Sequence, residues 1–186
     1  RGATLGQLRS GLTHVGLVAS RLEVQAALPH MLVTNEHFPT AATLRALEPE
    51  MQALRIMVIR QKSSWTKEAT MRSIFARIGE ALAPLLDRFQ PIILLDCAKS
   101  HLSWRVVATA SRNNLWVAYI PASLTWLLQP CDTHVFAAYK AAIDARYSAL
   151  RSESAAGEVS DEQWLRVVCE TIIAVLRDRD WAHAFA

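Results

Sequence analysis

The stretch from residue 91 to residue 96, Pro-Ile-Ile-Leu-Leu-Asp, is apolar along most of its length and ends in an acid. A run that is apolar on both faces is typical of a central strand covered by helices on both sides. An acid that ends such a strand lies at the carboxyl edge of the sheet, where open α/β sheets form their ligand crevices. Alternatively, the Asp96 side chain caps the turn that follows. Periodicity alone does not decide between these two interpretations.

Segments typical of strands and helices lie on both sides of this stretch. Upstream, β-branched and apolar runs predict an antiparallel hairpin and a third strand, and apolar residues spaced by three and four then predict an amphipathic helix. This order of elements predicts a mixed α/β sheet covered by helices. The expected strands cover residues 13–19, 26–33, 54–59 and 115–120, and the expected helices cover 66–88, 102–112 and 161–177, with another helix beginning at residue 132.

Length and composition predict a single globular domain over residues 1–186, in which a polar linker at 152–160 precedes the last helix. Apolar residues make up 52% of the chain and charged residues 20%, which excludes a disordered protein. No apolar stretch reaches the roughly 18 residues that a bilayer span needs, so we expect no membrane association. The three cysteines cannot form a closed disulfide framework, which favours a reducing, intracellular setting.

The net charge of +3 is unevenly distributed along the sequence. Between residues 60 and 77 stand five basic residues and one acid, Glu68. Such a cluster can face nucleic-acid phosphates, or it can be the solvated face of a helix, and charge alone leaves both interpretations open.

A second acid, Asp132, strengthens the interpretation of Asp96 as a functional residue. It follows a further predicted strand and a loop and opens the next predicted helix, where the helix dipole stabilises negative charge. An ordinary N-terminal acid would have the same position. Taken together, however, a strand end and the helix after the neighbouring strand can meet at the sheet edge. Two carboxylates there could share a hard cation such as Mg²⁺ and support phosphoryl transfer.

Two motifs resemble a known family. Residues 93–101, Ile-Leu-Leu-Asp-Cys-Ala-Lys-Ser-His, resemble the second-aspartate strand of the DDE endonucleases that include pogo, Tigger and centromere-protein-B-like proteins. Residues 118–132, which end in Leu-Leu-Gln-Pro-Cys-Asp, resemble the Leu-Gln-Pro-Leu-Asp signature of the same family. Residues 135–140 resemble the helix that follows this signature, and Ser64-Trp65 before a helix matches another recurrent feature.

The resemblance implies a ribonuclease-H-like fold and a transposase that cleaves and joins DNA strands with two Mg²⁺ or Mn²⁺ ions. Asp96 would be the second catalytic and metal-binding acid and Asp132 the third. The first acid of the family would lie on a strand before residue 13, and residues 1–12 contain no acid. We therefore expect an N-terminally truncated or decayed copy, which is an enzyme only if that acid exists upstream. The alternative is a domesticated, non-catalytic nucleic-acid-binding or scaffold domain with the same fold.

The family resemblance also implies DNA as the partner, homo-oligomers on DNA ends and a nuclear location. The expected DNA contacts are Arg60, Lys62, Lys67, Lys99, His101 and Lys140. Most of the tryptophans are expected to pack in the core, and Trp126 is the foremost candidate for stacking on a base.

Several residues depart from the family pattern. Cys97, Lys99 and Thr133-His134 stand where other residues are usual, which fits decay or reuse of the domain. Cys97, His101, Cys131 and His134 also have a spacing that suggests zinc. Neighbouring strand residues point to opposite faces, however, so Cys97 and Asp96 should not share one crevice. A phosphatase with Asp96 as nucleophile would need a second acid where Ala98 stands.

Overall fold

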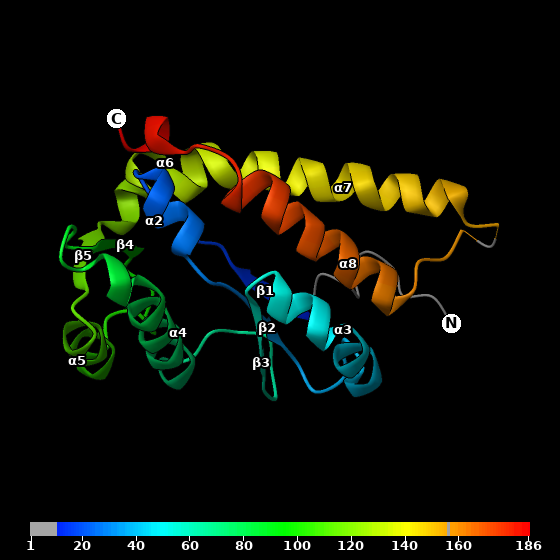
Figure 1. Cartoon of the computed structure of the whole chain (residues 1–186), viewed down its shortest axis with the longest axis horizontal. Coiled ribbons are helices and arrows are strands. Elements are labelled where there is room, and N and C mark those ends of the chain that lie inside the picture. Colours follow the sequence, from blue (N-terminus) through cyan, green and yellow to red (C-terminus); the bar gives the residue numbers. More distant parts are fainter. Residues whose placement is uncertain (1–10, 156) are drawn as a thin grey trace. The chain divides into compact units, whose positions relative to one another are not determined.

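A computed structural model describes residues 11–155 and 157–186. The fold is mixed α/β, and the chain forms two compact units that alternate along the sequence (Figure 1). Within the described residues, unit 1 comprises 11–16, 30–65 and 137–179, and unit 2 comprises 17–29, 66–136 and 180–186. The expectation of a single domain over residues 1–186 stays a prediction. No helix in the described part of the chain is long and apolar enough to cross a membrane.

Unit 1 is built on a three-stranded sheet of order β1-β2-β3, with strands β1 (Leu12–Val15), β2 (His30–Thr34) and β3 (Ile56–Arg60). Strand β1 pairs antiparallel with β2, as the predicted hairpin required, and β3 pairs parallel with β2. All five residues of the central strand β2 are buried. Helix α3 (Ala41–Ala53) makes the crossover between the two parallel strands, and the Thr40 side chain caps its N-terminus.

The connection between β1 and β2 differs from the tight turn that a hairpin needs. Leu22–Ala27 form a short helix, α2, which belongs to unit 2. The physical reason is composition, because Leu, Glu, Gln and Ala are good helix formers and the segment lacks the Gly or Asn of a tight turn. The buried Gln25 amide accepts a hydrogen bond from Ala19 N at 2.6 Å and fixes the chain that leads into α2.

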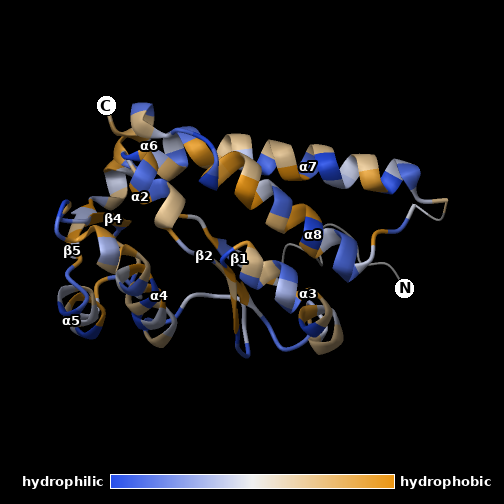
Figure 2. Ribbon diagram, viewed as in Figure 1, coloured by the Kyte–Doolittle hydropathy of each residue, from blue (hydrophilic) through white to orange (hydrophobic). Residues whose placement is uncertain are grey.

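Two long helical segments complete unit 1. Helix α7 (Phe136–Glu153) is followed by α8 (Asp161–Thr171), which continues as the π-helix η4 (Ile172–Arg177) and matches the predicted range. The predicted linker lies between α7 and α8, and its residue 156 is outside the described part. Helices α7 and α8 pack together through an edge-to-face contact between Tyr147 and Trp164. Figure 2 shows apolar and polar residues alternating along both helices.

Three aromatic rings form a cluster inside unit 1, of which His30 and Tyr139 are buried and His14 is half-buried. The His14 ring lies 5.7 Å from the His30 ring and 5.1 Å from the Tyr139 ring, measured between centroids. Within the described residues, His14 Nε2, both ring nitrogens of His30 and the Tyr139 hydroxyl have no hydrogen-bond partner. Burial lowers the pKa of His30 to about 4, with a smaller contribution from the positive charge of Arg177.

Unit 2 holds a parallel pair of strands, β4 (Ile92–Asp96) and β5 (Trp116–Ile120), in which Asp96 aligns with Ile120. Helices α4 (Glu68–Leu82) and α5 (Trp104–Arg112) pack on each other, and the apolar residues of α4 are buried as its periodicity predicts. The remaining short elements are the 3-10 turns η1 (Ala83–Leu85), η2 (Ala122–Leu124) and η5 (Ala182–Phe185), helix α6 (Thr125–Leu128) and the π-helix η3 (Cys131–Val135).

The burial of strand β4 differs from the sequence-based expectation. Among the described residues, β4 pairs with β5 alone, and Ile92 and Leu94 remain 56% and 39% exposed. The expectation of a central strand covered on both faces is therefore wrong for the described structure, because an apolar run does not reveal how many layers cover it. Trp65 and Trp116 are also exposed rather than packed, while Trp164 and Trp181 are buried as expected.

Candidate active site at the end of strand β4

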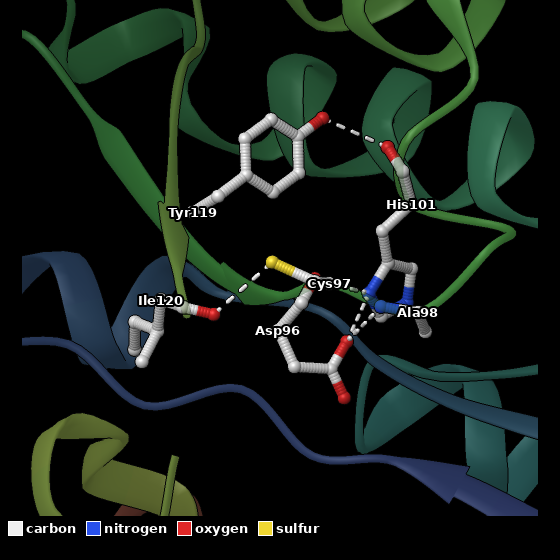
Figure 3. A network of polar contacts seen from close by, with 6 residues as sticks. All are labelled: Asp96, Cys97, Ala98, His101, Tyr119 and Ile120. Atoms are coloured by element: carbon white, nitrogen blue, oxygen red, sulfur yellow. Dashed lines mark hydrogen bonds and ion pairs between the residues drawn. The ribbon is translucent and has the colours of Figure 1, made fainter. Parts of the chain in front are cut away.

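The carboxylate of Asp96 lies at the carboxyl end of β4, where the chain leaves the parallel strand pair. Its Oδ1 accepts a hydrogen bond from Ala98 N at 3.1 Å, which closes an Asx turn. The capping interpretation is thus correct for this oxygen. Figure 3 shows the second oxygen pointing away from the turn, and it accepts no hydrogen bond from the described residues. The Asp96 side chain is 40% exposed, so this second oxygen can bind a ligand.

His101 holds the Asp96 carboxylate from the other side of the turn. Its Nδ1 lies 2.5 Å from Asp96 Oδ1 and 3.2 Å from the Asp96 carbonyl oxygen. Both of these oxygens are acceptors, so Nδ1 is the protonated nitrogen that donates to them. The Tyr119 hydroxyl in turn donates to the His101 carbonyl at 2.8 Å, which ties the turn after β4 to strand β5 (Figure 3). Partial burial, with Cys97 nearby, raises the pKa of Tyr119 and keeps this hydroxyl a donor.

Cys97 points away from the Asp96 carboxylate, as strand geometry predicts. Its thiol donates to the Ile120 carbonyl at 3.3 Å and joins the ends of the two strands (Figure 3). Burial, together with the charge of Asp132, raises the pKa of the Cys131 thiol to about 12, so this cysteine stays a protonated packing group. The described residues contain no group of three or more His, Cys, Asp or Glu that could hold a metal, and the zinc alternative gains no support.

Asp132 lies in the π-helix η3 that opens the long helix α7, and its side chain is exposed. The carbonyl of Gln129 accepts hydrogen bonds from the backbone N–H of Asp132 and of Thr133, each at 3.0 Å. The loop is therefore held by the Gln129 backbone. Its side-chain Oε1 is buried without a partner among the described residues.

Asp96 and Asp132 thus lie in the same unit, Asp96 as the last residue of β4 and Asp132 in η3, which follows β5 after two short helical turns. No hydrogen bond or ion pair of the described chain joins them directly, so their convergence stays a prediction. Sequence reasoning missed Tyr119, whose outward position on a strand carries no signal for a bond to the turn after β4.

The expected DNA contacts are distributed over both units. Lys67, Lys99 and His101 belong to unit 2, and Lys99 is an exposed residue of the turn after Asp96. Arg60, Lys62 and Lys140 belong to unit 1. The Arg60 guanidinium donates to the Glu36 carbonyl and so holds a loop of its own unit.

Comparison with known proteins identifies the family of this chain. The family described as DDE superfamily endonuclease matches residues 21–180, a range that includes Asp96, His101 and Asp132. Neither the curated proteins nor the solved structures contained a match. The matched range covers most of the chain, and the protein therefore belongs to the DDE superfamily endonucleases.

Proposed function

We propose that this chain is part of a transposase-type domain with a ribonuclease-H-like fold that cleaves and joins DNA strands. The observation that carries the proposal is the position of Asp96. It is a partly exposed carboxylate at the end of a parallel strand, with one oxygen uncommitted among the described residues, in a chain of the DDE superfamily.

The donor set suits a hard divalent cation. Mg²⁺ and Mn²⁺ prefer carboxylate oxygens, and the free oxygen of Asp96 and the exposed carboxylate of Asp132 would supply them. Such ions would activate a water or a DNA 3′-hydroxyl and stabilise the departing oxygen. In this proposal His101 is a positioning residue, since its Nδ1 fixes the Asp96 carboxylate, and Lys99 in the same turn faces the phosphates.

A second candidate function is a non-catalytic DNA-binding or scaffold domain. The contact that favours it is the one between His101 and Asp96, because at 2.5 Å it occupies one carboxylate oxygen. The sequence also differs from the family pattern at Cys97, Lys99 and Thr133-His134, and these differences favour the non-catalytic candidate as well. In either case the proposed partner is DNA, with homo-oligomers on DNA ends and a nuclear location.

The test is thermal unfolding of the chain, with and without Mn²⁺ or Mg²⁺. At about ten times the dissociation constant, binding stabilises the fold by roughly 1.4 kcal/mol, or about 3–6 °C. Asp96→Asn and Asp132→Asn should each remove this shift. Asp87→Asn, which changes an exposed acid elsewhere in unit 2, should keep it.

Cleavage of a DNA substrate then separates the two candidates. Metal-dependent cleavage that both site variants lose supports the enzyme. DNA binding that persists in both variants, without cleavage by the unaltered protein, supports the scaffold. If metal leaves the unaltered protein unchanged, the two-carboxylate site is wrong.

A further inference from the structure

A groove runs between helix α3 and strand β3 inside unit 1, far in sequence from the candidate active site. Its volume is about 500 Å³, and residues from one face of α3 and from β3 form its walls. The same arrangement, a helix beside the outer strand of a sheet, allows some domains to bind an extended peptide by β-strand addition.

Strand β3 has a free edge that faces away from β2. The sheet order places β3 at the margin, and no strand of the described chain pairs with its outer side. His30 N donates to Arg55 O, and Gln61 N donates to Thr34 O, so the odd-numbered residues of β3 direct their backbone groups toward β2. In a parallel ladder the alternate residues then direct theirs outward. These are Ile56, Val58 and Arg60, and all three line the groove.

The lining combines an apolar floor with a basic rim. Leu44, Met51 and Ile56 contribute to the floor. The charged residues that border the groove are three arginines and one acid, namely Arg45, Arg55, Arg60 and Glu48. The Glu48 carboxylate accepts a hydrogen bond from the Gln52 amide. The groove therefore carries a net positive charge above an apolar surface.

We propose that this groove binds an extended segment of a partner protein that carries acidic and apolar side chains on the same face, at every second position, and that the segment adds to β3 as a further strand. Unpaired strand edges bind other strands, because only a backbone offers donors and acceptors at the matching spacing. The five residues of β3 offer an edge of about 13 Å. Successive side chains of a strand point to opposite faces, so the side chains that face the groove stand at every second position of the segment. Some of them would place apolar groups over the floor, and others would bring carboxylates to the arginines on the rim. DNA fits less well, since phosphates accept hydrogen bonds but cannot donate to the outward carbonyls.

The charge part of the proposal is tested by titrating the unaltered chain against a fluorescent seven-residue peptide. This peptide has glutamate and valine in turn at its odd positions and serine at its even positions. Saturable binding in an anisotropy titration is expected, and the same peptide with lysine in place of glutamate should not bind. Arg45→Glu should weaken binding about three- to tenfold, the effect of replacing one exposed attraction by repulsion. Arg151→Glu, an exposed arginine at the end of α7 and outside the groove, should leave binding unchanged.

The strand-addition part is tested with two N-methylated forms of the peptide, one at the glutamate and valine amides and one at the serine amides. A strand pairs through one edge, so only one form should lose binding. Val58→Pro should abolish binding while β3 stays paired with β2, because the Val58 N–H points outward. Far-UV circular dichroism checks that this variant folds.

Other results overturn the proposal. Equal binding of the lysine peptide, or full binding by Arg45→Glu, refutes the recognition of acidic side chains. Loss of binding in both N-methylated forms, or in neither, refutes the strand edge. Displacement of the peptide by a DNA duplex would assign the groove to nucleic acid. A concentration-dependent dimer that Val58→Pro dissociates would assign the edge to a second copy of the chain.

Discussion

The buried His30 predicts that unit 1 loses stability at mildly acidic pH. His30 is fully buried on β2, and its ring nitrogens have no hydrogen-bond partner within the described residues. The groups around it are His14, Tyr139 next to His14, and the positively charged Arg177. None of them is an acid that would compensate a proton on His30. Burial therefore keeps the ring neutral in the folded state.

The sign and size of the effect follow from the two pKa values of His30. The pKa is 6.5 in the unfolded chain and about 4 in the folded one, so the unfolded state binds the proton first. The contribution of neutral His30 is fully present above pH 6.5 and is lost as the pH falls toward 4. Each pH unit in this window costs about 1.4 kcal/mol, or roughly 3 kcal/mol over the whole window. Burial also lowers the pKa of His14, so this residue adds a loss of the same sign.

Urea unfolding between pH 7.5 and 5.0, followed by circular dichroism, measures this loss. His30→Leu should remove roughly 2 kcal/mol of the decrease in unfolding free energy between pH 6.5 and 5.0. At pH 7.5 it should be neutral or stabilising, since it replaces a buried ring without hydrogen bonds by an apolar side chain. His37→Leu is the matched control, because the His37 side chain is exposed in the loop before α3. If the profile of His30→Leu follows that of the unaltered protein, the burial argument is refuted.

Three smaller perturbations test the local structure by thermal or urea unfolding. Gly79→Ala should destabilise the protein by about 1–3 kcal/mol, because the added Cβ would lie 2.5 Å from Asn113 Cβ. This clash should outweigh the better helix propensity of alanine. A stabilised variant would show that α4 and α5 are farther apart. Arg55→Gly should stabilise the protein by about 0.5–1 kcal/mol, since Arg55 has a φ of 53° and glycine adopts this angle without strain. Asn114→Gly, at a φ of 56°, should be nearly neutral, because asparagine tolerates this region better than arginine. Equal effects of the two substitutions would contradict this reasoning. Ser160→Ala should cost about 1 kcal/mol by removing the capping box of α8, and an unchanged midpoint would argue against that cap.

Local patterns in the sequence predicted several elements. The three- and four-residue spacing of apolar residues in α4 and the Ser160 start of α8 determine these helices from within the segment itself. Asp96 at a strand end was also predictable, because an acid that ends an apolar run stands out in the sequence. The opposite directions of Asp96 and Cys97 followed from strand periodicity alone.

Contacts between distant residues decided the rest. A helix, α2, connects β1 and β2 in place of a tight turn, and one face of β4 is exposed. The Tyr119 hydroxyl binds the turn after Asp96. The sequence of the segment itself predicts none of these three features. Within residues 11–155 and 157–186, His30 has no hydrogen-bond partner and the outer edge of β3 has no strand beside it, and both facts likewise depend on which segments lie nearby. The physical reason is that periodicity reports the conformation and apolar face of one element. Burial, pKa and hydrogen bonding depend on the neighbours that the tertiary structure supplies.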